Sequence, residues 1–214
     1  MKYIIMCGGK YSRWKTPRQL LKIQGEEIVA RTIRLLKSEG VRNIAISSND
    51  NRFAAFGVPL LKHQNEMTVR GTDDVSGAWV NAFYPTADPA CYLMGDVVFS
   101  QAAIRTIVQT ETDSIAFFGS TPPFSPMFIK EYAEPFAFKV NDQKRFRAAI
   151  DFVNANLGTG IFCRHPIAWE LWQVINGFDV REINFDSVTP INDYTCDIDN
   201  PKDAERIEAV LCVL

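Results

Sequence analysis

Ile4-Ile5-Met6-Cys7-Gly8-Gly9-Lys10-Tyr11-Ser12-Arg13 is the stretch around which this chain is organised. Its apolar start predicts a buried strand, which leads directly into two glycines, two cations and a hydroxyl. Such a loop presents backbone N–H groups at the carboxyl end of a sheet, and glycine lets that backbone approach a phosphate because it has no Cβ. Lys10 and Arg13 add the positive charge that a polyphosphate needs. The stretch predicts a nucleoside triphosphate site, with candidate contacts at Cys7, Gly8, Gly9, Lys10 and Ser12.

Two better-known phosphate loops are absent from this stretch. The P-loop requires a glycine five residues before its Gly-Lys pair and a Ser or Thr after it, whereas Gly9-Lys10 is followed by Tyr11. The dinucleotide pattern G-x-G-x-x-G does not match the spacing of Gly8 and Gly9. The alternative interpretation is a tight strand-to-helix turn with solvated charges.

Strand and helix patterns alternate along all 214 residues. We expect strands at residues 2–6, 43–47, 58–62, 90–94, 114–118, 134–140, 160–163 and 180–185. We expect helices at residues 26–39, 73–83, 101–109, 144–154, 166–175 and 201–210. This alternation predicts a single three-layer, Rossmann-like α/β domain over residues 1–214, with a mostly parallel mixed sheet.

Composition narrows the class of protein. A net charge of −2 argues against a general nucleic-acid binder. The apolar run after Met1-Lys2-Tyr3 is too short for a signal peptide or a membrane span. Five scattered cysteines without a C-x-x-C pair are typical of reduced thiols. These features predict a cytoplasmic protein with no nucleic-acid or membrane partner, and they leave a homodimer open.

Pro17-Arg18-Gln19-Leu20 and the Gly25 that follows extend the first stretch into a longer pattern. Together they resemble the nucleotidyltransferase superfamily, which has a GT-A-type fold and includes sugar-phosphate nucleotidyltransferases, molybdenum cofactor guanylyltransferase and the phosphocholine and methylerythritol cytidylyltransferases. That family has a glycine-rich loop ending in Arg, followed by Pro-Lys-x-Leu. The chain departs from it at Cys7, where the family has Ala, and at Arg18, where the family has Lys. The resemblance implies that Arg13 and Arg18 are catalytic.

Gly95-Asp96 follows an apolar run that predicts a central strand. A carboxylate at the carboxyl end of such a strand lies where open α/β sheets bind ligands. Mg²⁺ prefers one or two carboxylates plus phosphate oxygens, and the resembling family has an Asp at this place. Asp96 is therefore predicted to be a metal ligand. The alternative is a turn or N-cap residue before the helix at 101–109.

Asp197 and Asp199 supply the second acidic site. In an extended segment their side chains point the same way, so they repel each other unless a cation or a donor lies between them. The segment Cys196–Asp203 resembles the family's Asp-Ile-Asp-x-Pro-x-Asp ending, which implies that one of the two completes the magnesium site with Asp96. Asp199 is preferred, although it is also placed to cap the last helix. We expect Asp203 to stabilise the N-terminus of that helix.

Three weaker patterns concern the substrates. Residues 67–77 match a region that the family uses to read base and ribose, which makes Gly71 and Ser76 candidate nucleotide contacts, or else members of a plain loop. Residues 158–162 resemble a strand near the family's acceptor site. The aromatic residues of 117–128, with Trp79, Trp169 and Trp172, suggest a cage for a phosphorylated amino alcohol such as phosphocholine. The alternative, which we favour, is that these rings form the core.

The resemblance implies a Mg²⁺-dependent transferase that joins a nucleoside monophosphate to a small phosphorylated acceptor and releases pyrophosphate. The compact chain favours CTP, while GTP stays open. One competing function is a nucleotide-sugar glycosyltransferase, which usually carries a mid-chain Asp-x-Asp where this chain has Gly95-Asp96-Val97. The other is a nucleotide-binding protein that has lost catalysis, suggested by Arg18.

Overall fold

A seven-stranded sheet forms the centre of the molecule in the order β12-β10-β11-β8-β1-β4-β5. The computed structural model describes residues 1–8, 16–62, 68–70, 74–76, 79–124 and 130–213. The strands of the sheet, in the same order, are β12 (Val188–Pro190), β10 (Ile115–Gly119), β11 (Pro135–Val140), β8 (Ala90–Met94), β1 (Lys2–Met6), β4 (Ile44–Ser47) and β5 (Leu60–Leu61). Only β11 runs antiparallel to its neighbours, β8 and β10. The predicted mostly parallel mixed sheet is confirmed.

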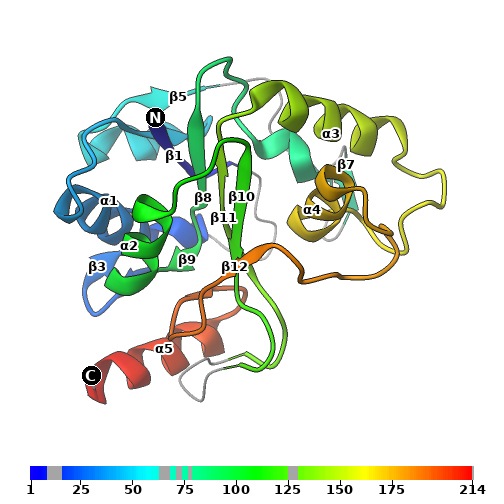
Figure 1. Ribbon diagram of the computed structural model, residues 1–214. Coiled ribbons are helices and arrows are strands. Elements are labelled where there is room, and N and C mark those ends of the chain that lie inside the picture. The colour runs from blue at the N-terminus through cyan, green and yellow to red at the C-terminus, as the bar shows by residue number, and fades with distance from the viewer. Residues whose placement is uncertain (9–15, 63–67, 71–73, 77–78, 125–129, 214) are drawn as a thin grey trace.

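Helices cover both faces of this sheet (Figure 1). One layer contains α1 (Ile28–Ser38) and α2 (Gln101–Gln109), and the other contains α3 (Gln143–Ala155) and α4 (Ala168–Asn176). The last helix, α5 (Pro201–Val213), lies apart from both layers. Strands enclosed in this way are apolar on both sides, as in β1, where Ile4 and Ile5 are fully buried.

Short elements complete the described chain. They are the 3₁₀ helices η1 (Arg18–Leu20), η2 (Asn51–Phe56) and η3 (Trp79–Ala82) and the paired strands β2 (Lys22–Ile23) with β3 (Glu26–Glu27), β6 (Thr68–Arg70) with β7 (Asp74–Ser76), and β9 (Val97–Val98) with β13 (Cys196–Asp197). None of the helices in the described part has the length and apolar character that a membrane crossing requires. The cysteines carry free thiols, and those of Cys7, Cys91 and Cys196 are buried.

Three sequence-based elements are wrong. The expected helix at 73–83 is replaced by β7 and η3, where Val75 pairs with Val69 across the β6–β7 ladder. The expected strand at 160–163 does not form, because Gly158 and Gly160 adopt φ values of +80° and +85°. The expected strand at 180–185 is a turn in which Asp179 accepts from the backbone N–H of Arg181 at 2.9 Å, and pairing begins only at β12.

The aromatic residues assigned to a cage belong mainly to the core. Phe117 and Phe118 are fully buried in β10, and Trp169 packs edge-on against Phe117 with ring centroids 5.0 Å apart. Trp172 lies 5.4 Å from Phe117 and is 2% exposed. Trp79 packs against Phe83 at 5.4 Å, on the edge of the same aromatic cluster. The core interpretation is therefore correct for these residues, and the cage has no support from them.

The order in which successive strands join the sheet reverses at β1. From β1 the chain moves outward through β4 to β5, then crosses back so that β8 pairs with the other edge of β1. Open α/β sheets bind ligands at such a switch point, outside the carboxyl ends of the strands. The residues that follow β1 and β8, which include Gly8 and Asp96, are therefore brought together.

Gly95 fixes this junction by close backbone contact. Its N–H donates to the carbonyl of Met6 at 3.0 Å. A Cβ on Gly95 would lie 2.3 Å from that carbonyl oxygen and 2.8 Å from Sγ of Cys7. The absence of a side chain thus allows the turn that carries Asp96 to lie directly against the end of β1.

We expect Gly95→Ala to lower the free energy of unfolding by about 3 kcal/mol, because the added methyl group must displace backbone atoms in a packed core. Chemical denaturation followed by circular dichroism measures this. Gly40→Ala is the control, since Gly40 has φ +81° but open space around its Cβ position, and backbone strain alone costs about 1 kcal/mol there. A cost for Gly95→Ala no larger than that of Gly40→Ala would contradict the assigned role.

Candidate active site

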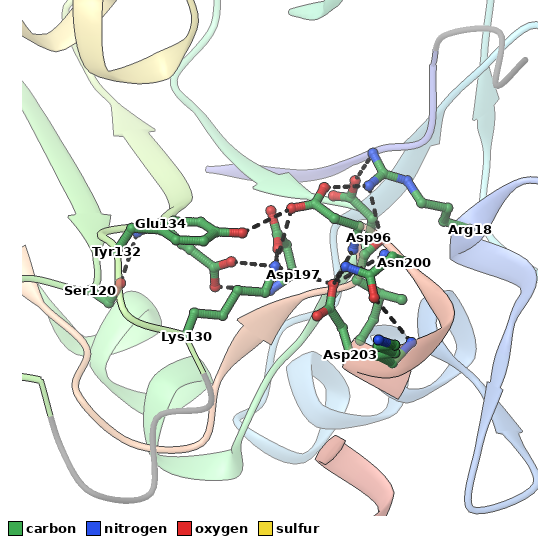
Figure 2. Close-up of polar contacts among 12 residues, drawn as sticks. Arg18, Asp96, Ser120, Lys130, Tyr132, Glu134, Asp197, Asn200 and Asp203 are labelled. Carbon is green, nitrogen blue, oxygen red and sulfur yellow. Dashed lines mark hydrogen bonds and ion pairs between the residues drawn. The ribbon is translucent and has the colours of Figure 1, made fainter. Parts of the chain in front are cut away.

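Four segments that are far apart in the sequence meet beside the switch point. They are η1, the turn after β8, the segment that leads into β11, and the stretch between β13 and α5. Figure 2 shows Arg18 and Lys130 pointing from opposite sides toward the acidic residues among them. The candidate metal ligands Asp96, Asp197 and Asp199 are all part of this assembly.

Arg18 joins two of the predicted metal ligands. One guanidinium nitrogen, Nη2, lies 2.7 Å from Oδ2 of Asp96, and the other, Nη1, lies 2.7 Å from Oδ1 of Asp199. Nη1 also donates to the carbonyl of Ile198 at 2.8 Å. The planar fork of arginine suits this bridge, which a lysine ammonium reproduces poorly. We refer to Asp96 and Asp199 as the outer pair.

The outer pair is held in place by backbone contacts. The N–H of Ile198 donates to the carbonyl of Asp96 at 3.0 Å, which ties the C-terminal segment to the turn after β8. Asp96 does not cap α2, because Ser100 does so by accepting from the N–H of Ala103 at 2.8 Å. The N-cap role considered for Asp96 is therefore excluded, whereas Asp96 does lie in a turn, and its role as a metal ligand stays a prediction.

Asp203 fixes the backbone around Asp199. Its Oδ2 accepts from the backbone N–H groups of Asp199 at 2.9 Å and of Asn200 at 3.0 Å, and from the Asn200 amide at 2.9 Å. Asn200 in turn accepts from the N–H of Lys202 at 3.0 Å and so caps α5. Asp199 is not the cap. Asp203 stabilises the start of α5, as predicted, and also orients Asp199.

Lys130 is a site residue that sequence analysis missed. Its ammonium forms ion pairs with four carboxylates: Glu134 at 2.7 Å, Asp199 at 3.1 Å, Asp203 at 3.4 Å, and Asp197. The Lys130 side chain is 3% exposed and that of Glu134 is 1% exposed. We refer to Lys130, Glu134, Asp197 and Asp203 as the inner cluster. Its only local signal is the i,i+4 spacing of Lys130 and Glu134, which is common on surfaces.

The electrostatics of the two groups differ. Burial opposes ionisation of Asp199, but Lys130 and Arg18 hold its pKa below the usual value, so this carboxylate is ionised at neutral pH. Burial raises the pKa of Glu134. Burial, the hydrogen bond to Glu134 and the charge of Glu134 raise the pKa of Asp197. Burial by itself would lower the pKa of Lys130, but Asp197 and Glu134 raise it overall, so the ammonium stays charged.

The donor atoms fit a hard divalent cation. Carboxylate oxygens of Glu134, Asp197 and Asp199 lie within 4.8 Å of one another, with the ammonium of Lys130 ion-paired to all three. The outer pair converges on the single guanidinium of Arg18 from two different segments. Oxygen ligands of this kind suit Mg²⁺.

Several predicted site residues lie outside the described part of the chain. They are Gly9, Lys10, Ser12, Arg13 and Gly71. Ser76 lies in β7, where only the backbone is described. Cys7 is buried, its N–H donates to the carbonyl of Ser47 at 2.9 Å, and burial and then Asp96 raise the pKa of its thiol. The Cys7 thiol is therefore neutral and buried near Asp96, and its contact with a nucleotide stays a prediction.

Residues 3–150 match the MobA-like NTP transferase domain. The chain belongs to this family. It is thus a nucleotidyltransferase by family, as the resemblance implied. A comparison with curated protein sequences gives no match.

Solved structures with a similar fold extend over nearly the whole chain. CTP:phosphocholine cytidylyltransferase from Streptococcus pneumoniae aligns over 98% of both chains with a TM-score of 0.56 and 15% identity. The inositol-1-phosphate CTP transferase from T. maritima aligns over 98% of this chain and 95% of its own, with a TM-score of 0.55 and 12% identity. A putative glucose-1-phosphate thymidylyltransferase from Bacillus anthracis aligns over 98% of this chain and 94% of its own, with a TM-score of 0.57 and 16% identity. These likenesses establish the nucleotidyltransferase fold.

We expect Asp203→Ala to lower the free energy of unfolding by about 1–3 kcal/mol, because it removes the acceptor shared by three donors at the start of α5. Thermal or urea unfolding measures the loss. Glu205→Ala, at an exposed position of the same helix, is the control and should change stability by less than about 0.5 kcal/mol. Equal stability of the two variants would show that Asp203 does not hold this segment.

Proposed function

We propose that the protein transfers a nucleoside monophosphate from a nucleoside triphosphate, with CTP as the first candidate, to a small phosphorylated acceptor and releases pyrophosphate. The observation that carries this proposal is the bridge from Arg18 to Asp96 and Asp199 at the switch point of the sheet. In support of the proposal, the bridge joins a guanidinium, which is suited to phosphate, to two carboxylates, which are suited to a metal, near the carboxyl end of β1. We also propose that residues 1–214 act as one nucleotidyltransferase domain.

The reaction requires an in-line displacement at the α-phosphorus. An oxygen of the acceptor phosphate forms the new P–O bond, while the bond between the α-phosphorus and the bridging oxygen to the β-phosphorus breaks. Pyrophosphate leaves with that oxygen and the bonding electrons. The acceptor phosphate is already an anion, so no general base is needed. Positioning and charge neutralisation therefore supply most of the catalysis.

The chain's own residues divide these tasks. Arg18 is the phosphate-binding cation, because the two N–H groups of its guanidinium fork can donate to two oxygens of one phosphate. Asp96 and Asp199 would hold Mg²⁺, which when bound neutralises charge on the triphosphate. Asp203 holds Asp199 in place by accepting a hydrogen bond from the backbone N–H of Asp199. Lys10, Arg13 and the glycines of the first loop are proposed to hold the remaining phosphate oxygens, and Gly71 and Ser76 to contact the nucleoside.

CTP is the first candidate donor because the chain is compact and because two proteins of similar fold are named for CTP. GTP is the second candidate, since Cys7–Arg13 is closest to the guanylyltransferase form of the loop. A phosphorylated sugar is preferred over phosphocholine as the acceptor, because Phe117, Phe118 and Trp169 are enclosed in the core.

A second candidate function is nucleotide binding without transfer. It is favoured by the same bridge, because the Arg18 guanidinium lies between the two carboxylates that would hold the metal. Metal binding by the outer pair then requires Arg18 to give up at least one of these contacts to a phosphate.

A pyrophosphate-release screen separates these functions. All four nucleoside triphosphates are tested with Mg²⁺ against phosphorylated sugars, alcohols and phosphonates. Transfer predicts release that requires both an acceptor and the divalent cation, and Asp96→Asn should abolish it while leaving the circular dichroism spectrum unchanged. Nucleotide binding by calorimetry without release for any pair would favour the binding protein instead.

We expect Arg18→Ala to lower kcat/KM by roughly 30- to 1000-fold, which corresponds to about 2–4 kcal/mol at the transition state. Arg18→Lys keeps the charge but loses the fork, so its activity should fall between those of Arg18→Ala and the parent. Steady-state kinetics with the pair found in the screen measures both. Arg181→Ala is the control, because Arg181 is exposed and pairs only locally with Asp179 among the described contacts. An unchanged kcat/KM for Arg18→Ala would show that Arg18 only bridges Asp96 and Asp199 and takes no part in the reaction.

A further inference from the structure

The acidic residues of the site are divided between two cations. Arg18 bridges the outer pair, and its side chain is 17% exposed. Lys130 occupies the inner cluster and is 3% exposed. Asp199 faces both cations, with Oδ1 toward Arg18 and Oδ2 toward Lys130. Five carboxylates are thus arranged around two positive side chains of fixed position.

We propose that Lys130 is the resident cation of the inner cluster, that it closes Glu134 and Asp197 to divalent metal, and that it thereby assigns metal binding to Asp96 and Asp199. The inference rests on the proposed function, because it concerns which carboxylates serve the transfer reaction. It makes Lys130 a positioning residue, since it acts through the acidic side chains.

The geometry of the inner cluster supports a permanent occupant. Oxygens of Glu134, Asp197 and Asp199 surround the ammonium, which matches the three donors of a lysine. The ring of Tyr132 lies with its centroid 5.4 Å from the same nitrogen. The space between these carboxylates is therefore filled by a charge that the chain itself carries.

Burial explains why this cation is needed. Glu134 is 1% exposed and Asp203 is 5% exposed, so water cannot compensate their charge. Removing the only described cation that contacts these two carboxylates leaves buried negative charge, which is costly. A free metal ion would have to expel a tethered ammonium that is always present. The outer pair is more accessible, because the side chain of Asp199 is 46% exposed and that of Asp96 is 19% exposed.

Lys130 also directs Asp199 toward the outer site. Its contact with Oδ2 at 3.1 Å leaves Oδ1 facing Arg18 and the segment of Asp96. The hydroxyl of Tyr132 lies 3.4 Å from the same Oδ2 and holds the same orientation. One carboxylate is thereby shared between a structural cation and the proposed metal position.

The test is metal rescue of Lys130→Met, which removes the charge and keeps much of the side-chain volume. Thermal unfolding is measured with and without MnCl₂ and without nucleotide. We expect a lower midpoint without metal and a rise of about 5–10 °C with saturating Mn²⁺, beyond any rise in the parent. This extra rise should persist in Lys130→Met/Asp96→Asn and disappear in Lys130→Met/Asp197→Asn.

Lys139→Met is the matched control. Lys139 is also a buried lysine, but its ammonium donates to the carbonyls of Ile107, Val108 and Thr110 at the end of α2. Its loss should lower the midpoint with no rescue by Mn²⁺. Lys130→Arg keeps a cation in the inner cluster and should also show no extra rise.

Equal Mn²⁺ shifts in the parent and Lys130→Met, or an extra rise that depends on Asp96 rather than Asp197, would overturn the proposal. If Lys130→Met is recovered unfolded, it is refolded in Mn²⁺; native near-ultraviolet dichroism only with the metal supports the proposal, and failure in both conditions counts against it. None of these measurements uses turnover. A negative pyrophosphate screen therefore refutes the proposed function separately from the role of Lys130.

Discussion

Repulsion between carboxylates is the constraint on which the site depends. Asp96, Glu134, Asp197, Asp199 and Asp203 converge at the carboxyl end of the sheet, and such a group is stable only when cations compensate it. The chain meets this requirement with Arg18 from one side and Lys130 from the other. These contacts join η1, the segment before β11 and the start of α5.

The backbone junction at Gly95 acts together with this charge balance. It brings the turn after β8 against the end of β1, which places Asp96 within reach of Arg18. The acidic group therefore lies close to the carboxyl end of β1. The Gly95-Asp96 turn thus contributes to both the packing of the sheet and the electrostatics of the site, because Gly95 packs against the end of β1 and Asp96 pairs with Arg18.

Much of the fold was predictable because its strands are enclosed on both faces. A continuous apolar run such as Ile4-Ile5-Met6 has few alternatives to a buried parallel strand, and β1 and β8 were located at their observed bounds. The region 68–82 was not predictable from helical spacing, because the backbone of Val69 pairs with that of Val75 across the β6–β7 ladder, and a helical pattern does not indicate this pairing. Near residue 160 the positive φ of two glycines overrides the apolar pattern.

The residues of the candidate site also fall into those that the sequence predicts and those that it does not. The sequence predicts Arg18, Asp96 and Asp199 as site residues because each stands in a recognisable local pattern, and the structure shows that these three side chains contact one another. Lys130 and Glu134 were missed because their role depends on burial and on partners 63 to 73 positions along the chain, which a local pattern does not contain. Asn200, rather than Asp199, caps α5, because Asn200 directly precedes the first helical residue, and the two carboxylate oxygens of Asp199 contact the two cations instead.

The bridge from Arg18 to Asp199 also bears on the order of folding. It joins residues 181 positions apart, which is among the longest closures that this chain contains. Loop closure of this length is entropically costly, and contacts of high sequence separation are generally slow to form. The sheet and its flanking helices can assemble from shorter-range contacts, whereas the outer pair is complete only after both ends of the polypeptide have docked. The outer pair is therefore expected to form late in folding, since a partly folded chain does not yet bring Asp96 and Asp199 together.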